Sequence, residues 1–114
     1  MQKVEAIIRR EKFSEVDAAL KAIDVVGLTC EDVNGRGRAK GADTQVLAHG
    51  KWTYEHEYVR RIKLEAVVND EDVEKVTKAI IEHAGSHSHG DGMIFVTPVY
   101  KAIDISAVPL LVTA

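Results

Sequence analysis

The sequence is poor in cysteine, proline and aromatic residues. Cys30 is the only cysteine among 114 residues, which excludes an internal disulfide framework and is typical of a reducing, cytoplasmic environment. We expect Cys30 to be a small buried residue on a strand. Hydrophobic residues nevertheless make up 46% of the chain, which indicates one folded domain rather than a disordered segment.

Two further absences narrow the class of protein. No apolar run approaches the roughly 20 residues of a membrane-spanning helix, and the first residues alternate charged and apolar side chains, unlike a secretory signal. The formal net charge of -3 argues against a nucleic-acid binder, because contacts with backbone phosphates require an excess of basic residues. We therefore expect a soluble cytoplasmic protein that does not insert into a membrane but can dock onto a membrane protein.

Two parts of the chain repeat each other at an offset of 60 residues. Residues 4–8 and 64–68 are β-type runs of matching pattern, and each is followed by apolar residues at helical spacing. Residues 28–33 and 93–99 read as the strands that close two β-α-β units. Pro98 predicts that the last strand lies at a sheet edge, since proline cannot donate to a ladder.

Turn and cap residues delimit the two predicted helices. Ser14 is the expected N-cap of the first helix, and Gly27 stops that segment. Asn69 or Asp70 is expected to cap the second helix, which Gly85 ends.

Two β-α-β units in series predict an α+β, ferredoxin-like βαββαβ fold. Its antiparallel sheet carries both helices on one face, and right-handed crossovers leave few other topologies. Because the strands look apolar at nearly every position, we expect the uncovered face to be apolar as well. That face must then meet another subunit, so self-association is predicted.

A long segment without clear periodicity, about residues 37–58, separates the two units. It contains Trp52, Tyr54 and Tyr58, which are the only tryptophan and two of the three tyrosines. Loops of this length are usually functional, and aromatic residues on them suit partner binding. A long hairpin with aromatic side chains paired across its strands is the alternative.

Two glycine clusters suggest a phosphate site. The run 35–41, Gly-Arg-Gly-Arg-Ala-Lys-Gly, combines backbone freedom with basic side chains, and a second cluster spans 90–92. Either cluster alone is a weak signal. Together they predict a binder of a phosphorylated metabolite.

The order of elements and both glycine motifs resemble the PII signal-transduction proteins over nearly the whole chain. The resemblance rests on the runs 4–9, 33–38 and 90–96. It implies a single PII-like domain over residues 1–114, assembled as a homotrimer, with an effector loop at about 37–59 and a C-terminal tail at about 100–114. It also implies adenine nucleotides bound between subunits, no catalysis, and a membrane transporter or metabolic enzyme contacted by the loop.

The resemblance assigns contacts residue by residue. The first phosphate-facing segment corresponds to Gly35, Gly37 and Arg38, and the second, expected on the other side of the cleft, corresponds to Gly90, Asp91 and Gly92, followed by Met93. Thr29 and Val67 match contacts with the adenine base, and Arg61 matches a basic residue at the foot of the loop. The partner-binding loop would use Lys40, Trp52, Tyr54 and Tyr58.

Four positions depart from the family pattern. Ala39 replaces a glutamine associated with ATP, magnesium and 2-oxoglutarate, and Met93 replaces a lysine. Asp104 and Ser106 stand where two arginines are expected. Because a triphosphate needs these cations, we expect ADP or AMP to be favoured over ATP. Similar losses occur in divergent members encoded beside carboxysome or bicarbonate-transport systems, so a role in inorganic-carbon or nitrogen metabolism is expected.

Three other interpretations of the sequence are less favoured. His83, His87 and His89 have a spacing compatible with a metal site in a trimeric protein of similar fold, although Gly85 interrupts the helix and a solvated loop is favoured. A weak ATPase is the enzymatic alternative, but no nucleophile and base are placed together. Tyr54 lies near a tyrosine that many PII proteins have nucleotidylated, without the usual surrounding sequence.

Overall fold

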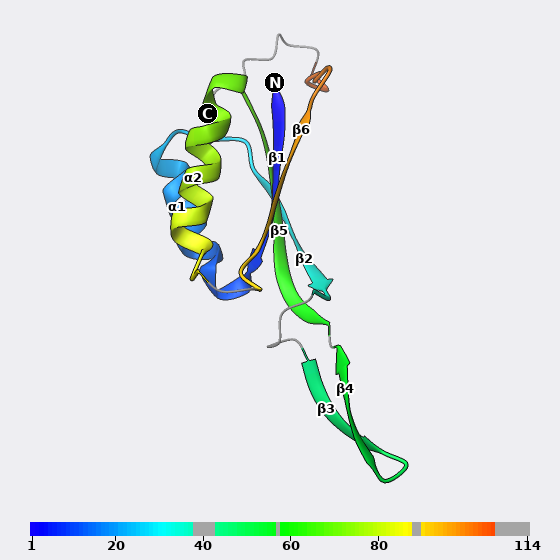
Figure 1. The fold of residues 1–114 in the computed structure, drawn as a ribbon. Coiled ribbons are helices and arrows are strands. Elements are labelled where there is room, and N and C mark those ends of the chain that lie inside the picture. Colours follow the sequence, from blue (N-terminus) through cyan, green and yellow to red (C-terminus); the bar gives the residue numbers. More distant parts are fainter. Residues whose placement is uncertain (38–42, 57, 88–89, 107–114) are drawn as a thin grey trace.

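The computed structural model describes residues 1–37, 43–56, 58–87 and 90–106, and its main body has two layers (Figure 1). The four strands β1 (Gln2–Arg9), β2 (Thr29–Gly35), β5 (Val59–Val68) and β6 (Gly92–Pro98) form an antiparallel sheet in the order β2-β5-β1-β6. The helices α1 (Phe13–Ala22) and α2 (Val73–Ala84) cover one face of it. The predicted ferredoxin-like fold is confirmed.

The core follows the sequence repeat. Val4, Ala6 and Ile8 of β1 are buried, and so are their counterparts 60 residues later on β5, Leu64, Ala66 and Val68. Buried and partly exposed residues alternate along these strands because successive side chains point to opposite faces of the sheet. Val16, Leu20, Val76, Ile80 and Ala84 supply the buried residues of the two helices.

The helix starts differ from the predicted caps. Short 3-10 turns, Arg10–Lys12 and Asp70–Asp72, precede the helices, so α1 begins at Phe13 with Lys12 in the N-cap position rather than Ser14. Asn69 holds the N-cap of the second turn without a side-chain capping hydrogen bond, and Asp72 holds that of α2. Gly85 is the C-cap of α2, as predicted.

The two edge strands explain one correct and one wrong prediction. β6 is an edge strand that ends at Pro98, as the proline indicated. Cys30 does lie on a strand, but it is exposed rather than buried. It pairs with the buried Leu64, yet β2 is the other edge of the sheet, where no further strand covers it.

The long segment contains a two-stranded arm rather than an irregular loop. β3 (Asp43–Ala48) and β4 (Lys51–His56) pair antiparallel, and Figure 1 shows the arm extending beyond the end of the main sheet. His49 and Gly50 make the turn, with φ of 51° and 73°, as a two-residue hairpin requires. The alternative hairpin reading is therefore right for the backbone. In the register, Trp52 lies opposite Leu47 and Tyr54 opposite Gln45, so neither ring has an aromatic partner directly across.

The uncovered face of the sheet is not uniformly apolar, which corrects the sequence-based expectation. At its centre Lys63 Nζ lies 3.5 Å from Glu5 Oε1, 3.6 Å from Glu65 Oε1 and 3.7 Å from Glu31 Oε1. Glu5 and Glu65 are direct cross-strand partners, which places two like charges opposite each other. Lys63 offsets this repulsion, and the carboxylates, Glu5 first, raise its pKa above the ordinary 10.5.

Replacing Lys63 by methionine is expected to lower the melting temperature at pH 7, because Glu5 and Glu65 then repel without a cation between them. The loss should shrink as the salt concentration rises, because salt screens the repulsion between charges near the surface. In the unmodified protein, the raised pKa means that the contribution of Lys63 is complete below pH 10.5 and is lost as the pH rises through the higher folded value. Thermal unfolding at several salt concentrations and pH values measures both effects. Lys101→Met is the control, because Lys101 is exposed and makes no ion pair among the described residues. An equal loss at low and high salt would contradict the charge account.

Among the described residues, no helix is both long enough and apolar enough to cross a membrane.

Candidate functional site

A glycine turn at one end of the sheet begins β6. Gly90 and Gly92 have φ of +91° and +137°, a region that side chains disfavour. A Cβ on Gly92 would lie 1.9 Å from the Ile7 carbonyl oxygen, so only glycine lets β6 enter the sheet beside β1. The turn is thus a fixed part of the fold.

Two arginines converge on this turn. Arg9 Nε and Arg61 Nη2 donate to the Gly90 carbonyl oxygen at 3.2 and 3.1 Å. They are direct cross-strand partners on β1 and β5, so two positive charges stand side by side. Arg61 was predicted as a site residue, whereas Arg9 was not. Its place at the end of β1 was the only feature of the sequence that could have pointed to such a role.

Asp91 balances one of the two charges. Its Oδ1 lies 3.5 Å from Arg9 Nη2, and its Oδ2 accepts a 2.6 Å hydrogen bond from the Ser86 amide. The Ser86 hydroxyl also donates to the carboxylate. Within the part of the chain that the structure describes, Arg61 has no acidic partner. Among the described residues, Arg61 is therefore a cation without an acidic partner beside a glycine turn, an arrangement that attracts anions.

Both glycine segments lie at the same end of one subunit. A Cβ on Gly35 would lie 3.7 Å from Arg61 Cγ, so the arginine stem passes the first segment and its guanidinium reaches the second. The segments, predicted to lie on opposite sides of a cleft, are thus linked within one subunit through one side chain. Gly37 is exposed, whereas Arg38 and Lys40 lie outside the described residues.

Thr29 and Val67 lie toward the other end of the sheet. Thr29 pairs with Glu65, and Val67 pairs with Lys3, which places both on the uncovered face. Val67 lies six residues along β5 from Arg61, about 20 Å, and Thr29, opposite Glu65, lies four residues from the level of Arg61, about 13 Å. One subunit therefore does not bring either residue next to the glycine turn.

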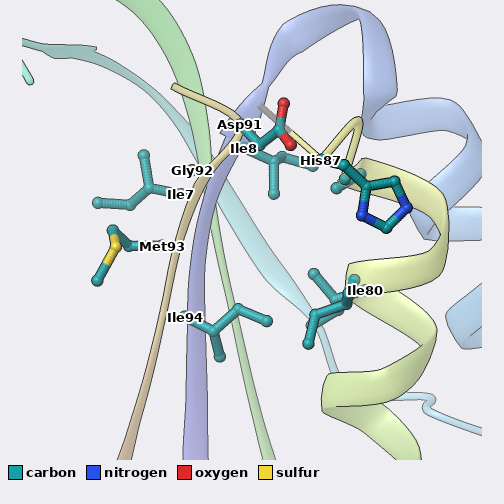
Figure 2. A pocket seen from close by; sticks show the side chains of 11 residues that line it. Ile7, Ile8, Ile80, His87, Asp91, Gly92, Met93 and Ile94 are labelled. Carbon is teal, nitrogen blue, oxygen red and sulfur yellow. The ribbon is translucent and has the colours of Figure 1, made fainter. Parts of the chain in front are cut away.

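Met93 follows the turn on the uncovered face, opposite Ile7, and is 60% exposed. Figure 2 shows Ile7 and Met93 pointing away from α2, while Ile94 points toward Ile80 on that helix. On the helix side, Ile80 and Ile94 border a pocket of about 380 Å³, whose lining also includes Asp91 and Gly92.

The root of the arm carries an exposed aromatic residue. The Tyr58 side chain is 67% exposed, and the Arg36 guanidinium carbon lies 5.6 Å from the centre of its ring, within cation-π range. The backbones of Trp52 and Tyr54 lie on β4, and their side chains are outside what the structure describes.

The histidines are not gathered into a described metal site. His83 lies in the last turn of α2, and His87 follows Gly85 with a φ of 61°. His89 lies outside the described residues. The residues that can be examined contain no group of three or more potential metal ligands.

The chain is similar to proteins of one family over most of its length. The family model described as nitrogen regulatory protein P-II matches residues 1–107. A nitrogen regulatory protein P-II of Nostoc punctiforme is 42% identical over 105 residues, covering 92% of this chain and 91% of the relative. That of Microchaete diplosiphon is 41% identical over the same shares, and the P-II 1 protein of Methanothermobacter thermautotrophicus is 39% identical, with 92% and 89% covered.

Proposed function

Since the chain belongs to the nitrogen regulatory protein P-II family, we propose that it senses an adenine nucleotide at the arginine-held turn and signals through its arm. The observation that carries the proposal is the convergence of Arg9 and Arg61 on Gly90 at the root of the arm. The relatives are named for nitrogen regulation, which favours nitrogen over inorganic-carbon metabolism as the setting.

The phosphates of the nucleotide would lie against Arg61 and the Gly90–Gly92 turn. Arg61 has spare guanidinium N–H groups, and a guanidinium can grip a phosphate with two hydrogen bonds. Arg38 and the Gly37 backbone would approach from the start of the arm. Arg9 and Asp91 hold each other, so they would position the turn rather than bind the ligand.

The site would be completed by a second subunit. Thr29 and Val67, the residues expected at the adenine base, lie about 13 and 20 Å along the sheet from the level of Arg61, at the phosphate end of their own chain. A nucleotide that contacts both groups must therefore lie between two copies. A homotrimer in which each copy offers its phosphate end to the base-binding face of its neighbour meets this need.

The nucleotide should carry few phosphates. Met93 offers no charge beside the turn, and Asp104 accepts hydrogen bonds from the Ser106 amide, at 2.8 Å, and hydroxyl, which hold its pKa below the ordinary value. Asp104 and Ser106 thus form a local turn at the positions where the family pattern has two arginines that would bind further phosphates. Calorimetric titration should show ADP or AMP binding at least as tightly as ATP. A clear preference for ATP, strengthened by 2-oxoglutarate, would contradict this.

Ligand binding would affect the arm at the two points where the arm leaves the main sheet. Gly35 ends β2, and Val59 begins β5 as its cross-strand partner, two residues before Arg61. A phosphate held by Arg61 therefore biases the geometry from which the arm departs. The arm would then dock onto a membrane transporter or a metabolic enzyme.

Replacing residues 43–56 by a short Gly-Ser linker, which keeps Arg38, is expected to leave ADP affinity within about threefold while abolishing ADP-dependent capture of a partner from host membrane and soluble fractions. The full-length protein and a Tyr58→Ala variant are the comparisons. Partner capture that survives removal of the arm would refute the arm as the docking element.

The weak ATPase and the metal-binding trimer remain the alternatives. Phosphate release from ATP above background would favour the first. Tight zinc binding that is lost in His87→Ala would favour the second.

A further inference from the structure

An open apolar pocket lies between the C-terminal half of α2 and the start of β6 (Figure 2). It measures about 380 Å³, and its apolar lining includes Ile8, Ile80, Ile81, Ala84, Met93 and Ile94. A pocket of this size and character is typical of binding sites. None of the proposed nucleotide contacts uses its helix side.

The pocket is open because β6 is an edge strand. The side chains of Ile81 on α2 and Val96 on β6 are 60% and 43% exposed, although both are aliphatic. Exposed aliphatic side chains at an open apolar pocket often mark a place where a partner or another segment packs.

The chain itself supplies a matching segment. Residues 107–114, which lie outside the described part, read Ala-Val-Pro-Leu-Leu-Val-Thr-Ala and carry no charged side chain. Ile103 and Ile105, which lead into this segment, are 70% and 102% exposed, so the apolar character begins before it.

The segment can reach the pocket of its own subunit. The pocket lies at Ile94, four residues before Pro98, which is about 13 Å back along β6. Sixteen residues follow Pro98 in the sequence. The described chain continues to Ser106, and the five residues from there to Leu111, fully extended, span up to about 17 Å, which exceeds the roughly 13 Å between Pro98 and Ile94.

We infer that residues 107–114 dock in this pocket of their own subunit, with Leu110 or Leu111 packed against Ile81 and Ile94. The pocket shares Asp91, Gly92 and Met93 with the arginine-held turn. Docking of the segment is therefore coupled to the ligand at that turn, a consequence that rests on the proposed function.

A disulfide trap tests the docking directly. In a Cys30→Ser parent, Ile81→Cys and Leu111→Cys are introduced together and oxidised mildly, since a disulfide forms only when the two Cα atoms come within about 7 Å. We expect most chains to cross-link within one subunit, which non-reducing electrophoresis and peptide mass spectrometry distinguish from cross-links between subunits. The control pair is Leu111→Cys with Lys21→Cys on α1. Cross-linking no greater than that of the control, or cross-linking mainly between chains, would overturn the inference.

Titration with ADP separates this inference from the proposed function. The oxidised and reduced forms of the trapped variant should differ at least threefold in ADP affinity. Equal affinities would overturn the coupling. Absence of ADP binding in the Cys30→Ser parent would count against the proposed function, while the docking would still be judged from the cross-link.

Discussion

Gly92→Ala is expected to destabilise the protein by roughly 3 kcal/mol or more, the range of severe backbone strain and overpacking. The added Cβ would lie 1.9 Å from the Ile7 carbonyl oxygen and 3.3 Å from the Ile8 Cα, and the φ of +137° disfavours any side chain. The backbone of β1 cannot yield without breaking its pairing with β5. Urea unfolding followed by circular dichroism measures the loss.

Gly27→Ala is the matched control for this change. A Cβ on Gly27 would meet nothing within 4 Å, so its effect should stay within about 0.5 kcal/mol. If Gly92→Ala unfolded at the same urea concentration as the control, the close approach of β6 to β1 would be refuted. The proposed phosphate turn would lose its basis with it.

Arg61→Met is expected to weaken ADP binding by about 10- to 100-fold, since a hydrogen bond to a charged group contributes about 1.5–3 kcal/mol. The methionine keeps the apolar stem beside Gly35 but removes the guanidinium that reaches Gly90. The fold should survive, because Arg9 still donates to the same carbonyl oxygen. Calorimetry gives the affinity, and thermal unfolding checks the fold.

Arg60→Met is the control on the same strand. Arg60 precedes Arg61 on β5, so the alternation of the strand places it on the opposite face of the sheet. It should change ADP affinity by less than about threefold, because it removes the same net charge from the protein without removing a contact. Equal losses in the two variants would show that general charge, rather than the arginine-held turn, attracts the nucleotide.

The fold was predictable because two local signals agree with the global arrangement. The repeat at an offset of 60 residues predicted equivalent strands and helices, and the buried residues obey it from Val4 and Leu64 onward. Gly85 predicted the end of α2 because glycine favours helix ends.

The errors arose where local sequence does not encode the environment. Cysteine is usually a buried residue, but only the order of the strands shows that Cys30 lies on an edge strand, β2. The uncovered face was expected to be apolar because the strands look apolar at nearly every position. It carries Ile7 and Val67, but also Glu5, Lys63 and Glu65.

The site was predictable in its glycines but not in its assembly. Gly90 and Gly92 were chosen for backbone freedom, and both have positive φ. The role of Arg9 depends on a contact 81 residues away, which no spacing along β1 shows. The hairpin was only the alternative prediction because His49 precedes Gly50, where Asn or Asp would have been a stronger turn signal.

Complementation between two weakly binding variants tests the central claim, a nucleotide site shared by two copies of the chain. Arg61→Met weakens the phosphate end, and Val67→Asp disables the base-binding face about 20 Å away, so each variant alone should bind ADP at least about tenfold more weakly than the unmodified protein. Equal amounts refolded together should regain about a quarter of the sites at full affinity, because one site in four then combines two intact halves. No recovery in the mixture, or full binding by Val67→Asp alone, would contradict the shared site.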